Sequence, residues 1–373
     1  MQRPFEAAES LLAEGLAARA FPAASIEVGR RARAIWSQWF GALTYDPGAA
    51  PCDRSTIFDL ASLTKVIATT TLTMRAVDEG LLGLGDPVGK WLPEWRGTDR
   101  AAVTIADLLA HASGLPAYLP FFRDHTGRVE YEPAICRMPL EYAPNTQSIY
   151  SDLGFMLLGF VLEDARAGHR RRQIEAAGIP VPGGLLDVPA QLRSQFRTIA
   201  TFLTSDPLTF NPPRAWRPRI APTEIDPWRG RLVVGEVHDE NAWALGGAAG
   251  HAGLFGTASA VGAFARAVLR TLAGERILAD PSTFHAFIRR SGVPGSSRAL
   301  GWDTMLPSSS CGALISPGAI GHTGFTGTSL WIDHERDLYI VLLTNRVHPS
   351  RENEKLRALR PRIHDAIVAA LPD

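Results

Sequence analysis

One stretch, residues 58–72, constrains the fold more than any other part of the chain; it reads FDLASLTKVIATTTL. From Ser62 onward its residues are apolar or small, apart from the single charge of Lys65. A helix formed by such a run is buried on all sides. It would therefore carry one amine into the protein core, where a charged group needs either a partner or a chemical role.

Ser62 and Lys65 are three residues apart, which on a helix brings their side chains to one face and within reach of each other. Burial disfavours the ammonium form of lysine, so Lys65 can accept the hydroxyl proton of Ser62 and make this serine a nucleophile. At the start of a helix the N–H of Ser62 is also unpaired, and it would stabilise an oxyanion. Four residues would then supply a nucleophile, its base and half of an oxyanion hole.

A structural role for this pair stays open at this point, because a four-residue motif is short enough to arise by chance. The composition favours the chemical role to some degree. Of the 38 basic residues only three are lysine, at positions 65, 90 and 355. Positions that need only a positive charge have arginine, which stays protonated and cannot serve as a base.

The overall composition indicates a globular protein with an ample core, since 46% of the residues are hydrophobic. The 38 basic and 38 acidic residues cancel, so neither nucleic acid nor an anionic membrane surface is an expected partner. A small molecule is the expected partner, and the oligomeric state stays open.

The sequence also favours a cytoplasmic protein. Its first twelve residues have acidic side chains and helical spacing where a signal peptide needs an unbroken apolar run. The longest apolar run, 153–162, is too short to span a bilayer. Cys52, Cys136 and Cys311 are far apart and form no C-x-x-C pair, which is typical of free thiols in a reducing compartment.

The order of the elements predicts the architecture. Residues 24–29 and 34–40 form a hairpin, and the central helix ends at Gly80. In the middle of the chain the apolar residues have helical spacing, and Thr104 is a predicted N-cap. Residues 180–240 are predicted to form long ordered loops over a site. The later elements are a helix, two strands and a last helix, at 258–272, 329–333, 338–344 and 352–370.

We therefore expect an α/β (α+β) fold: an antiparallel sheet flanked by helices, completed by both ends of the chain, with an inserted all-helical lobe. The predicted division places the first part of the α/β domain at 1–85, the helical lobe at 86–245 and the second part of the α/β domain at 246–373. A site at the boundary between the two lobes is the expectation.

Three motifs stand in order along the chain: SLTK at 62–65, YSD at 150–152 and HTG at 322–324, just before a strand. Together they resemble the serine β-lactamase and penicillin-binding-protein superfamily. The resemblance is to its branch of class C-like β-lactamases, DD-peptidases and carboxylesterases, and it implies the β-lactamase/transpeptidase-like fold. Segments 108–115 and 250–254 also resemble this branch, so the resemblance covers most of the chain.

This resemblance implies a role for each motif. Ser62 would be the acylated nucleophile, Lys65 the amine that helps to deprotonate it, and Tyr150 the general acid or base, in an anionic form favoured by Lys65. The N–H groups of Ser62 and Phe325 would form the oxyanion hole. The residues expected to contact the substrate are Asp152, His322, Thr323 and Gly324. The family needs neither a metal nor another cofactor.

Two positions depart from the family pattern. The second motif usually ends in Asn, and for Asp152 two roles stay open: a contact to the substrate, or an N-cap for the apolar helix that follows. In β-lactamases the third motif usually begins with Lys, whereas His322 is closer to the DD-peptidases and esterases. Since histidine is not reliably charged near pH 7, the clamp for a β-lactam carboxylate is weakened.

Other polar residues have plainer interpretations. The spacing of His238, Asp239 and His251 matches no standard set of metal ligands, so we expect these residues, with Glu224, to line or brace the cleft. His111 is expected to be a hydrogen-bonded histidine of the core.

The leading functional hypothesis is a serine hydrolase that forms an acyl-enzyme on Ser62 and cleaves small carboxylic esters, as a carboxylesterase does. The alternatives are an amidase or D-amino-acid peptidase acting on muropeptide-like substrates, a β-lactamase and an acyltransferase. A catalytically silent binding module is the alternative from outside the enzymes.

Overall fold

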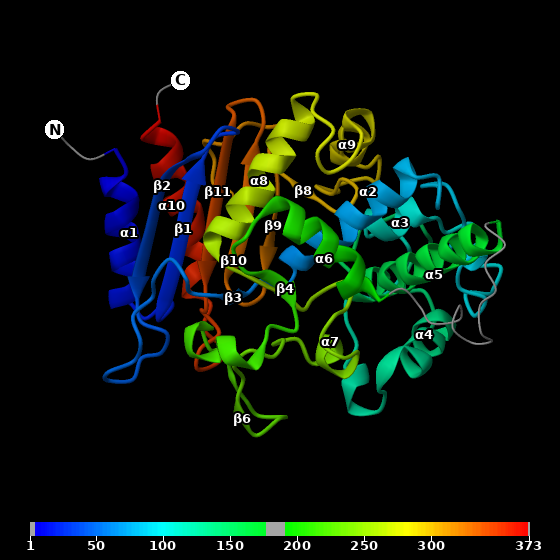
Figure 1. Ribbon diagram of the computed structural model, residues 1–373, viewed down its shortest axis with the longest axis horizontal. Coiled ribbons are helices and arrows are strands. Elements are labelled where there is room, and N and C mark those ends of the chain that lie inside the picture. The colour runs from blue at the N-terminus through cyan, green and yellow to red at the C-terminus, as the bar shows by residue number, and fades with distance from the viewer. Residues whose placement is uncertain (1–3, 177–190, 372–373) are drawn as a thin grey trace.

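The computed structural model describes residues 4–176 and 191–371, and its centre is a six-stranded antiparallel sheet (Figure 1). The strand order is β2-β1-β11-β10-β9-β8. The strands are β1 Ala23–Gly29, β2 Ala34–Gly41, β8 Asp303–Thr304, β9 Ile320–Gly324, β10 Thr328–Asp333 and β11 Leu338–Thr344. Because β1 pairs with β11, the two ends of the chain complete one sheet, as predicted.

The predicted hairpin is present, and the two later predicted strands form a second one. β1 and β2 are joined through 30–33, and β10 and β11 through 334–337. In β1 alternate side chains face opposite sides of the sheet, as a strand requires. Ile26 and Val28 belong to the core beneath the terminal helices, whereas Glu27 faces the other side and bonds Arg266.

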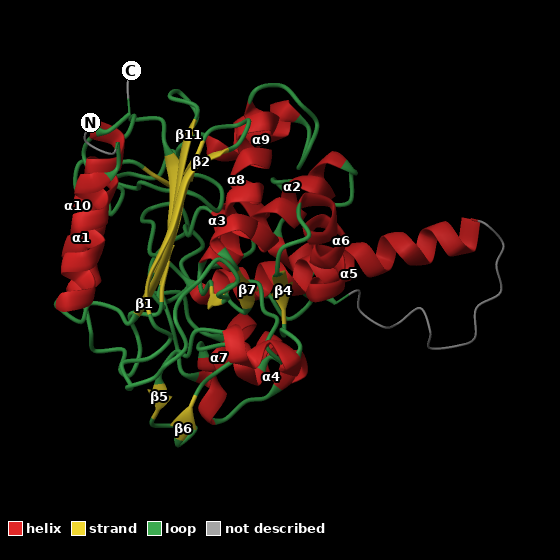
Figure 2. Ribbon diagram, turned by 60° about the vertical axis from the view of Figure 1, so that its left-hand side comes forward, coloured by secondary structure: helices red, strands yellow, loops and turns green. Residues whose placement is uncertain are grey.

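Helices α1 (Glu6–Ala17) and α10 (Lys355–Ala369) pack against each other on one face of the sheet, and α8 (Ala258–Leu272) covers the other face (Figure 2). The bounds of α8 agree with the prediction. Helix α10 begins three residues later than predicted, because Asn353 bonds the chain at Ala20 and the backbone N–H of Lys355 bonds the Asn353 side chain.

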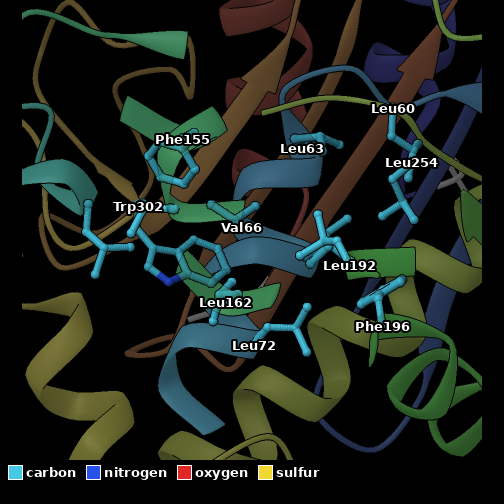
Figure 3. Close-up of a cluster of buried hydrophobic side chains, with 14 of the residues drawn as sticks. Leu60, Leu63, Val66, Leu72, Phe155, Leu162, Leu192, Phe196, Leu254 and Trp302 are labelled. Carbon is cyan, nitrogen blue, oxygen red and sulfur yellow. The ribbon is translucent and has the colours of Figure 1, made fainter. Parts of the chain in front are cut away.

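The largest core lies on the α8 side and includes the segment that follows Ser62 (Figure 3). Leu63 and Val66 of this segment pack in one cluster with Phe155 and Trp302, all fully buried. The predicted helix ends as expected, with α2 (Thr71–Asp78) followed by Gly80 at a positive φ of 67°. Its first part, η1 (Lys65–Thr70), is a π-helix.

The inserted segment is mainly helical and also contributes three short strands. Its elements are η2 Val88–Lys90, α3 Ile105–Leu109, η3 Phe121–Arg123, α4 Gly127–Arg137, α5 Asp152–Ala176, α6 Leu192–Leu203, β4 Leu208–Phe210, η4 Arg214–Arg219, β5 Ile225–Asp226, β6 Arg231–Leu232 and α7 Glu240–Ala244. The predicted N-cap at Thr104 is present as a capping box with Asp107. The predicted division into 1–85, 86–245 and 246–373 stays a prediction.

The expectation of loops over 180–240 is wrong for 192–203, which forms α6. Leu192, Phe196 and Ile199 recur at helical spacing and bury one face of this helix, a pattern hidden among the polar residues between them. Positions 180–190 lie outside the described residues. Strand β4 pairs with β7 (Leu254–Gly256), which also pairs with β3 (Phe58–Asp59) beside the nucleophile.

The remaining helix of the described residues, α9 (Pro281–Ile288), packs against α2 and α8. Across residues 4–176 and 191–371, no helix combines the length and the apolar character that crossing a bilayer requires.

Candidate active site

Ser62 lies on a turn between β3 and the π-helix. The residue before it, Ala61, has a positive φ of 47°, a conformation that costs a non-glycine residue about 1–3 kcal/mol. The side chain of Asp59 accepts a hydrogen bond from the Ala61 N–H at 2.8 Å and so supports this turn. The turn leaves Ser62 at the border of the cleft, just before the π-helix.

The β9–β10 turn holds the nucleophile turn from the other side. The hydroxyl of Thr328 donates to the carbonyl of Leu60 at 3.0 Å, and that of Thr326 donates to the carbonyl of Asp59 at 2.7 Å. Gly324 allows this approach, because a Cβ atom there would lie 2.6 Å from the Leu60 carbonyl oxygen. The HTG motif at 322–324 therefore packs directly against the turn that carries Ser62.

The amine of Lys65 is fully buried and has three acceptors, one for each of its N–H bonds. Its Nζ lies 3.1 Å from the Ser62 hydroxyl, 2.6 Å from Asp152 Oδ1 and 3.0 Å from the carbonyl oxygen of His251. The predicted contact between Ser62 and Lys65 is thus present.

The ion pair determines the resting charge of Lys65. Burial acts to lower the pKa of Lys65, but the Asp152 carboxylate and the Tyr150 phenol outweigh it, so the pKa is raised. The expectation that burial leaves this amine neutral is therefore wrong for the free protein. The physical reason is the Asp152 carboxylate, which lies 2.6 Å from Lys65 Nζ and stabilises the ammonium form.

Tyr150 lies beside this amine, with the centre of its ring 4.9 Å from Lys65 Nζ. Its hydroxyl is buried and has no well-aligned hydrogen bond in the described part of the chain. Burial raises the pKa of Tyr150, and the opposing effects of Lys65 and Ser62, both close to the phenol, are smaller. The raised pKa favours the neutral phenol over the expected anionic form in the free protein.

The N-cap interpretation of Asp152 is wrong. Asp152 is the first residue of α5, and the hydroxyl of Ser151 accepts from the Gly154 N–H at 3.3 Å in the capping position. The Asp152 carboxylate is directed to Lys65 instead and borders the cleft.

The two backbone N–H groups of the predicted oxyanion hole have no partner in the described part of the fold. Those of Ser62 and Phe325 border the cleft, and neither has an acceptor among residues 4–176 and 191–371. The ring of Phe325 stacks on His238 at 5.6 Å and receives the guanidinium of Arg346 at 4.8 Å, which holds the turn in position.

His322 is buried and neutral. Its Nδ1 lies 2.8 Å from the carbonyl oxygen of Thr323, to which it donates, and its pKa is held well below the usual range by burial and by the nearby Arg298. The Arg298 guanidinium lies 3.4 Å from His322 Nε2 and 5.0 Å from the centre of the Tyr150 ring. The permanently charged guanidinium of Arg298 therefore lies beside His322, the first residue of the third motif.

These groups line one cleft of about 630 Å³. The predicted residues that border it are Ser62, Tyr150, Asp152, His322, Thr323, Gly324 and Phe325. Lys65 lies beneath the cleft surface. The structure thus brings every predicted site residue together, and their individual roles stay predictions.

The sequence profile of the family described as Beta-lactamase matches residues 8–363. A protein of Salmonella agona (strain SL483) named "Putative D-alanyl-D-alanine carboxypeptidase" is 32% identical over 335 residues, which cover 81% of this chain and 72% of that protein. The chain belongs to the beta-lactamase family.

Solved structures agree on the fold of this beta-lactamase family member. EstCE1, described as a hydrolase with promiscuous acyltransferase activity, has a TM-score of 0.72 at 20% identity and covers 97% of this chain and 98% of its own. The octameric penicillin-binding protein homologue from Pyrococcus abyssi has a TM-score of 0.66 at 20% identity, covering 94% and 76%. The family and the fold make this protein a serine hydrolase of the beta-lactamase type.

The acidic residues of the middle segment brace the cleft of this beta-lactamase family member. His238 bonds Glu224 at 2.9 Å, and His251 bonds Asp239 at 2.8 Å. Asp239 also caps α7 by accepting from the Ala242 N–H at 2.7 Å. These contacts fit the expected bracing role.

His111 is a buried histidine whose Nδ1 accepts from the backbone N–H of Ser151 at 3.0 Å. Its ring centre lies 4.6 Å from that of Tyr150, and burial holds its pKa well below the usual range. It therefore supports Tyr150 as a neutral group of the core, as expected.

Sequence reasoning missed Arg298. It is one of 35 arginines and lies 24 positions before His322, outside any motif. Only the packing of the segment before β8 against β9 brings its charge to the cleft, so no local pattern could have indicated it.

Proposed function

We propose that this protein is an acyl hydrolase whose substrates carry a carboxylate on the leaving group, as in a peptide that ends in a D-amino acid. The observation that carries the proposal is Arg298, a guanidinium held beside Tyr150 and His322 at the cleft. A guanidinium binds a carboxylate in a bidentate manner, and it supplies the charge that neutral His322 lacks. The name of the Salmonella agona relative supports this substrate class.

In the proposed reaction, Lys65 acts after it has lost its proton. The Ser62 hydroxyl attacks the substrate carbonyl and passes its proton to the neutral amine, 3.1 Å away. The oxyanion lies between the N–H groups of Ser62 and Phe325. Tyr150 gives its proton to the leaving amine, and the resulting phenolate faces the Lys65 ammonium.

Deacylation reverses these transfers. A water molecule attacks the acyl-enzyme and gives its proton to the Tyr150 phenolate, while Ser62 leaves and recovers its proton from Lys65. The net reaction consumes one water molecule and restores all three side chains.

The test compares two peptides that differ only at the end: one terminates in D-Ala-D-Ala with a free carboxylate, the other in the C-terminal amide. We expect kcat/KM to be higher for the free acid, and Arg298→Gln to lower it by about 10–100-fold for that peptide alone, the value of a charged hydrogen bond. Ser62→Ala is the inactive control. Equal rates on both peptides would contradict the proposal.

Ester cleavage, the leading hypothesis from the sequence, is the second candidate. It is favoured by the exposed aromatic side chains of Tyr118 and Phe325 at the cleft, which offer an acyl chain an apolar surface. This candidate would be favoured if the protein hydrolyses p-nitrophenyl butyrate in a Ser62-dependent reaction and cleaves neither peptide. In that case Arg298→Gln should leave the ester hydrolysis unchanged. Intact-mass measurement after benzylpenicillin tests the β-lactamase alternative in the same samples.

For the compartment we keep the cytoplasmic proposal. It is supported by three buried cysteines, none of which forms a disulfide. Fractionation of the native host with an antibody against the chain tests it.

A further inference from the structure

Arg360 is a buried cation without a counter-ion. It lies on α10 with 7% of its surface exposed, its buried Nε has no hydrogen-bond partner, and it forms no ion pair with a carboxylate in the described ranges. Burial, followed by the charge of Arg346, lowers the pKa of Arg360 to about 10. The group is therefore still charged at neutral pH, in a place where an unpaired charge is costly.

Arg346 adds a second positive charge, and burial lowers its pKa by more than the nearby carboxylates of Glu354 and Glu224 raise it. Its Nη1 donates to the backbone carbonyls of Arg351 at 3.1 Å and Asn353 at 2.7 Å, and none of its recorded contacts within the described residues is to a carboxylate. These carbonyls hold the guanidinium in place without neutralising it. Arg346 and Arg360 thus leave two positive charges close together.

The other arginines at this end of the cleft are neutralised. Arg351 binds Glu224 at 2.7 Å and Glu240 at 2.6 Å. Arg357 pairs with Glu354 at 3.7 Å. Four arginines thus face three glutamates, which leaves one positive charge in excess, and Arg346 and Arg360 are the two arginines of this group without an ion pair among the described residues.

Both residues border the cleft that holds Ser62 and Tyr150. Arg346 connects the α10 end of the cleft to the catalytic end. Its guanidinium lies 4.8 Å from the ring of Phe325, whose N–H is half of the predicted oxyanion hole. Leu356 and Arg357 of α10 border the same cleft, so the terminal helix forms this end of it. Helix α10 lies on the face of the sheet opposite α8 (Figure 2).

We propose that Arg360 and Arg346 form an anion-binding subsite at the α10 end of the catalytic cleft, which takes a carboxylate or a phosphate. Two guanidinium groups offer planar, bidentate donors of the kind that both anions accept. A bound anion would supply the missing counter-charge of Arg360. The subsite is formed by other residues than Arg298, and it does not depend on the peptide substrate proposed above.

The first test is direct binding of inorganic phosphate to the full chain by calorimetry, with thermal unfolding in parallel. We expect phosphate to bind and to raise the unfolding midpoint. Arg360→Met should weaken binding by about tenfold or more, and in phosphate-free buffer it should unfold at the same or a higher temperature, because a buried unpaired charge has been removed. The matched control is Arg362→Gln, since Arg362 is an exposed arginine of α10 paired with Glu14.

Absence of phosphate binding to the unaltered protein would overturn the proposal, as would equal binding by Arg360→Met. If Arg360→Met does not fold, Arg360→Lys keeps the charge and should bind phosphate more weakly than the unaltered protein but measurably. Loss of stability in Arg360→Met with unchanged phosphate binding would mean that Arg360 is only structural.

A kinetic comparison identifies the source of the anion. We compare p-nitrophenyl butyrate with the p-nitrophenyl monoester of glutaric acid, whose acyl chain ends in a carboxylate. A preference for the charged ester that Arg360→Met removes would assign the subsite to the substrate. Phosphate binding without such a preference would assign it to a free anion. If the D-Ala-D-Ala peptide is not cleaved, phosphate binding and the ester preference can still be measured. The peptide proposal and the anion-subsite proposal are therefore tested separately.

Discussion

The amine of Lys65 lies 2.6 Å from the carboxylate of Asp152, closer than to any other of its hydrogen-bond partners. Asp152 stands where the family usually has Asn, so this ion pair is specific to the YSD form of the second motif. It makes the resting Lys65 an ammonium group, which has to lose a proton before it can act as a base.

Replacing Asp152 by Asn is expected to shift the pH dependence of activity. The carboxylate raises the pKa of Lys65, so its removal lowers that pKa and makes the neutral amine available at lower pH. We expect the rising limb of kcat/KM to move to lower pH. Asp164→Asn, which removes a carboxylate from the same helix away from the cleft, is the control. An unchanged limb would mean that Lys65 does not have to lose a proton.

Lys65→Arg is expected to lower kcat by about 10²–10⁴, although the positive charge is retained. Arginine stays protonated and cannot accept the Ser62 proton. The acylation rate, followed by intact mass, measures this step. Lys355→Arg, at an exposed lysine that bonds the Ala18 carbonyl, should leave the rate unchanged. Near-normal acylation in the Lys65→Arg variant would mean that Lys65 contributes only its positive charge.

Tyr150→Phe should separate activity from stability. Loss of the proton donor is expected to lower kcat by about 10²–10⁴. The free energy of unfolding should stay the same or rise, because the buried hydroxyl makes no well-aligned hydrogen bond among the described residues. Urea unfolding and steady-state kinetics measure the two effects.

Tyr131→Phe is the matched control for Tyr150→Phe. Its hydroxyl donates to Asn241 at 3.0 Å, so this variant should lose about 0.5–1.5 kcal/mol of stability and keep its kcat. A large stability loss in Tyr150→Phe with normal kcat would assign Tyr150 to the structure alone.

Thr328→Val tests the contact between the β9–β10 turn and the nucleophile turn. Loss of its hydrogen bond to Leu60 should cost about 0.5–1.5 kcal/mol of unfolding free energy and also lower kcat, because Ala61 is then held less firmly in its strained conformation. Thr271→Val removes a comparable buried hydrogen bond within α8 and should cost stability without changing kcat. Equal kcat in the two variants would contradict the role of the contact.

Local patterns in the sequence determined the elements and the three motifs. Alternation and turn residues predicted the hairpins, and the run after Ser62 predicted a buried helix. Spacing alone brought Ser62 and Lys65 together, because a helix relates residues three apart whatever surrounds them. It did not predict the π-helical form of 65–70, since that depends on the bonds that neighbouring segments make.

The tertiary structure alone decided the charges of the site. Whether Lys65 is neutral or an ammonium group depends on Asp152, 87 positions away, and the cation behind His322 comes from Arg298 on a segment without a motif. The unpaired charge of Arg360 likewise exists only because the folded chain places no carboxylate beside it among the described residues. Electrostatic energies depend on distance and burial, and both are created when segments far apart in the sequence pack together.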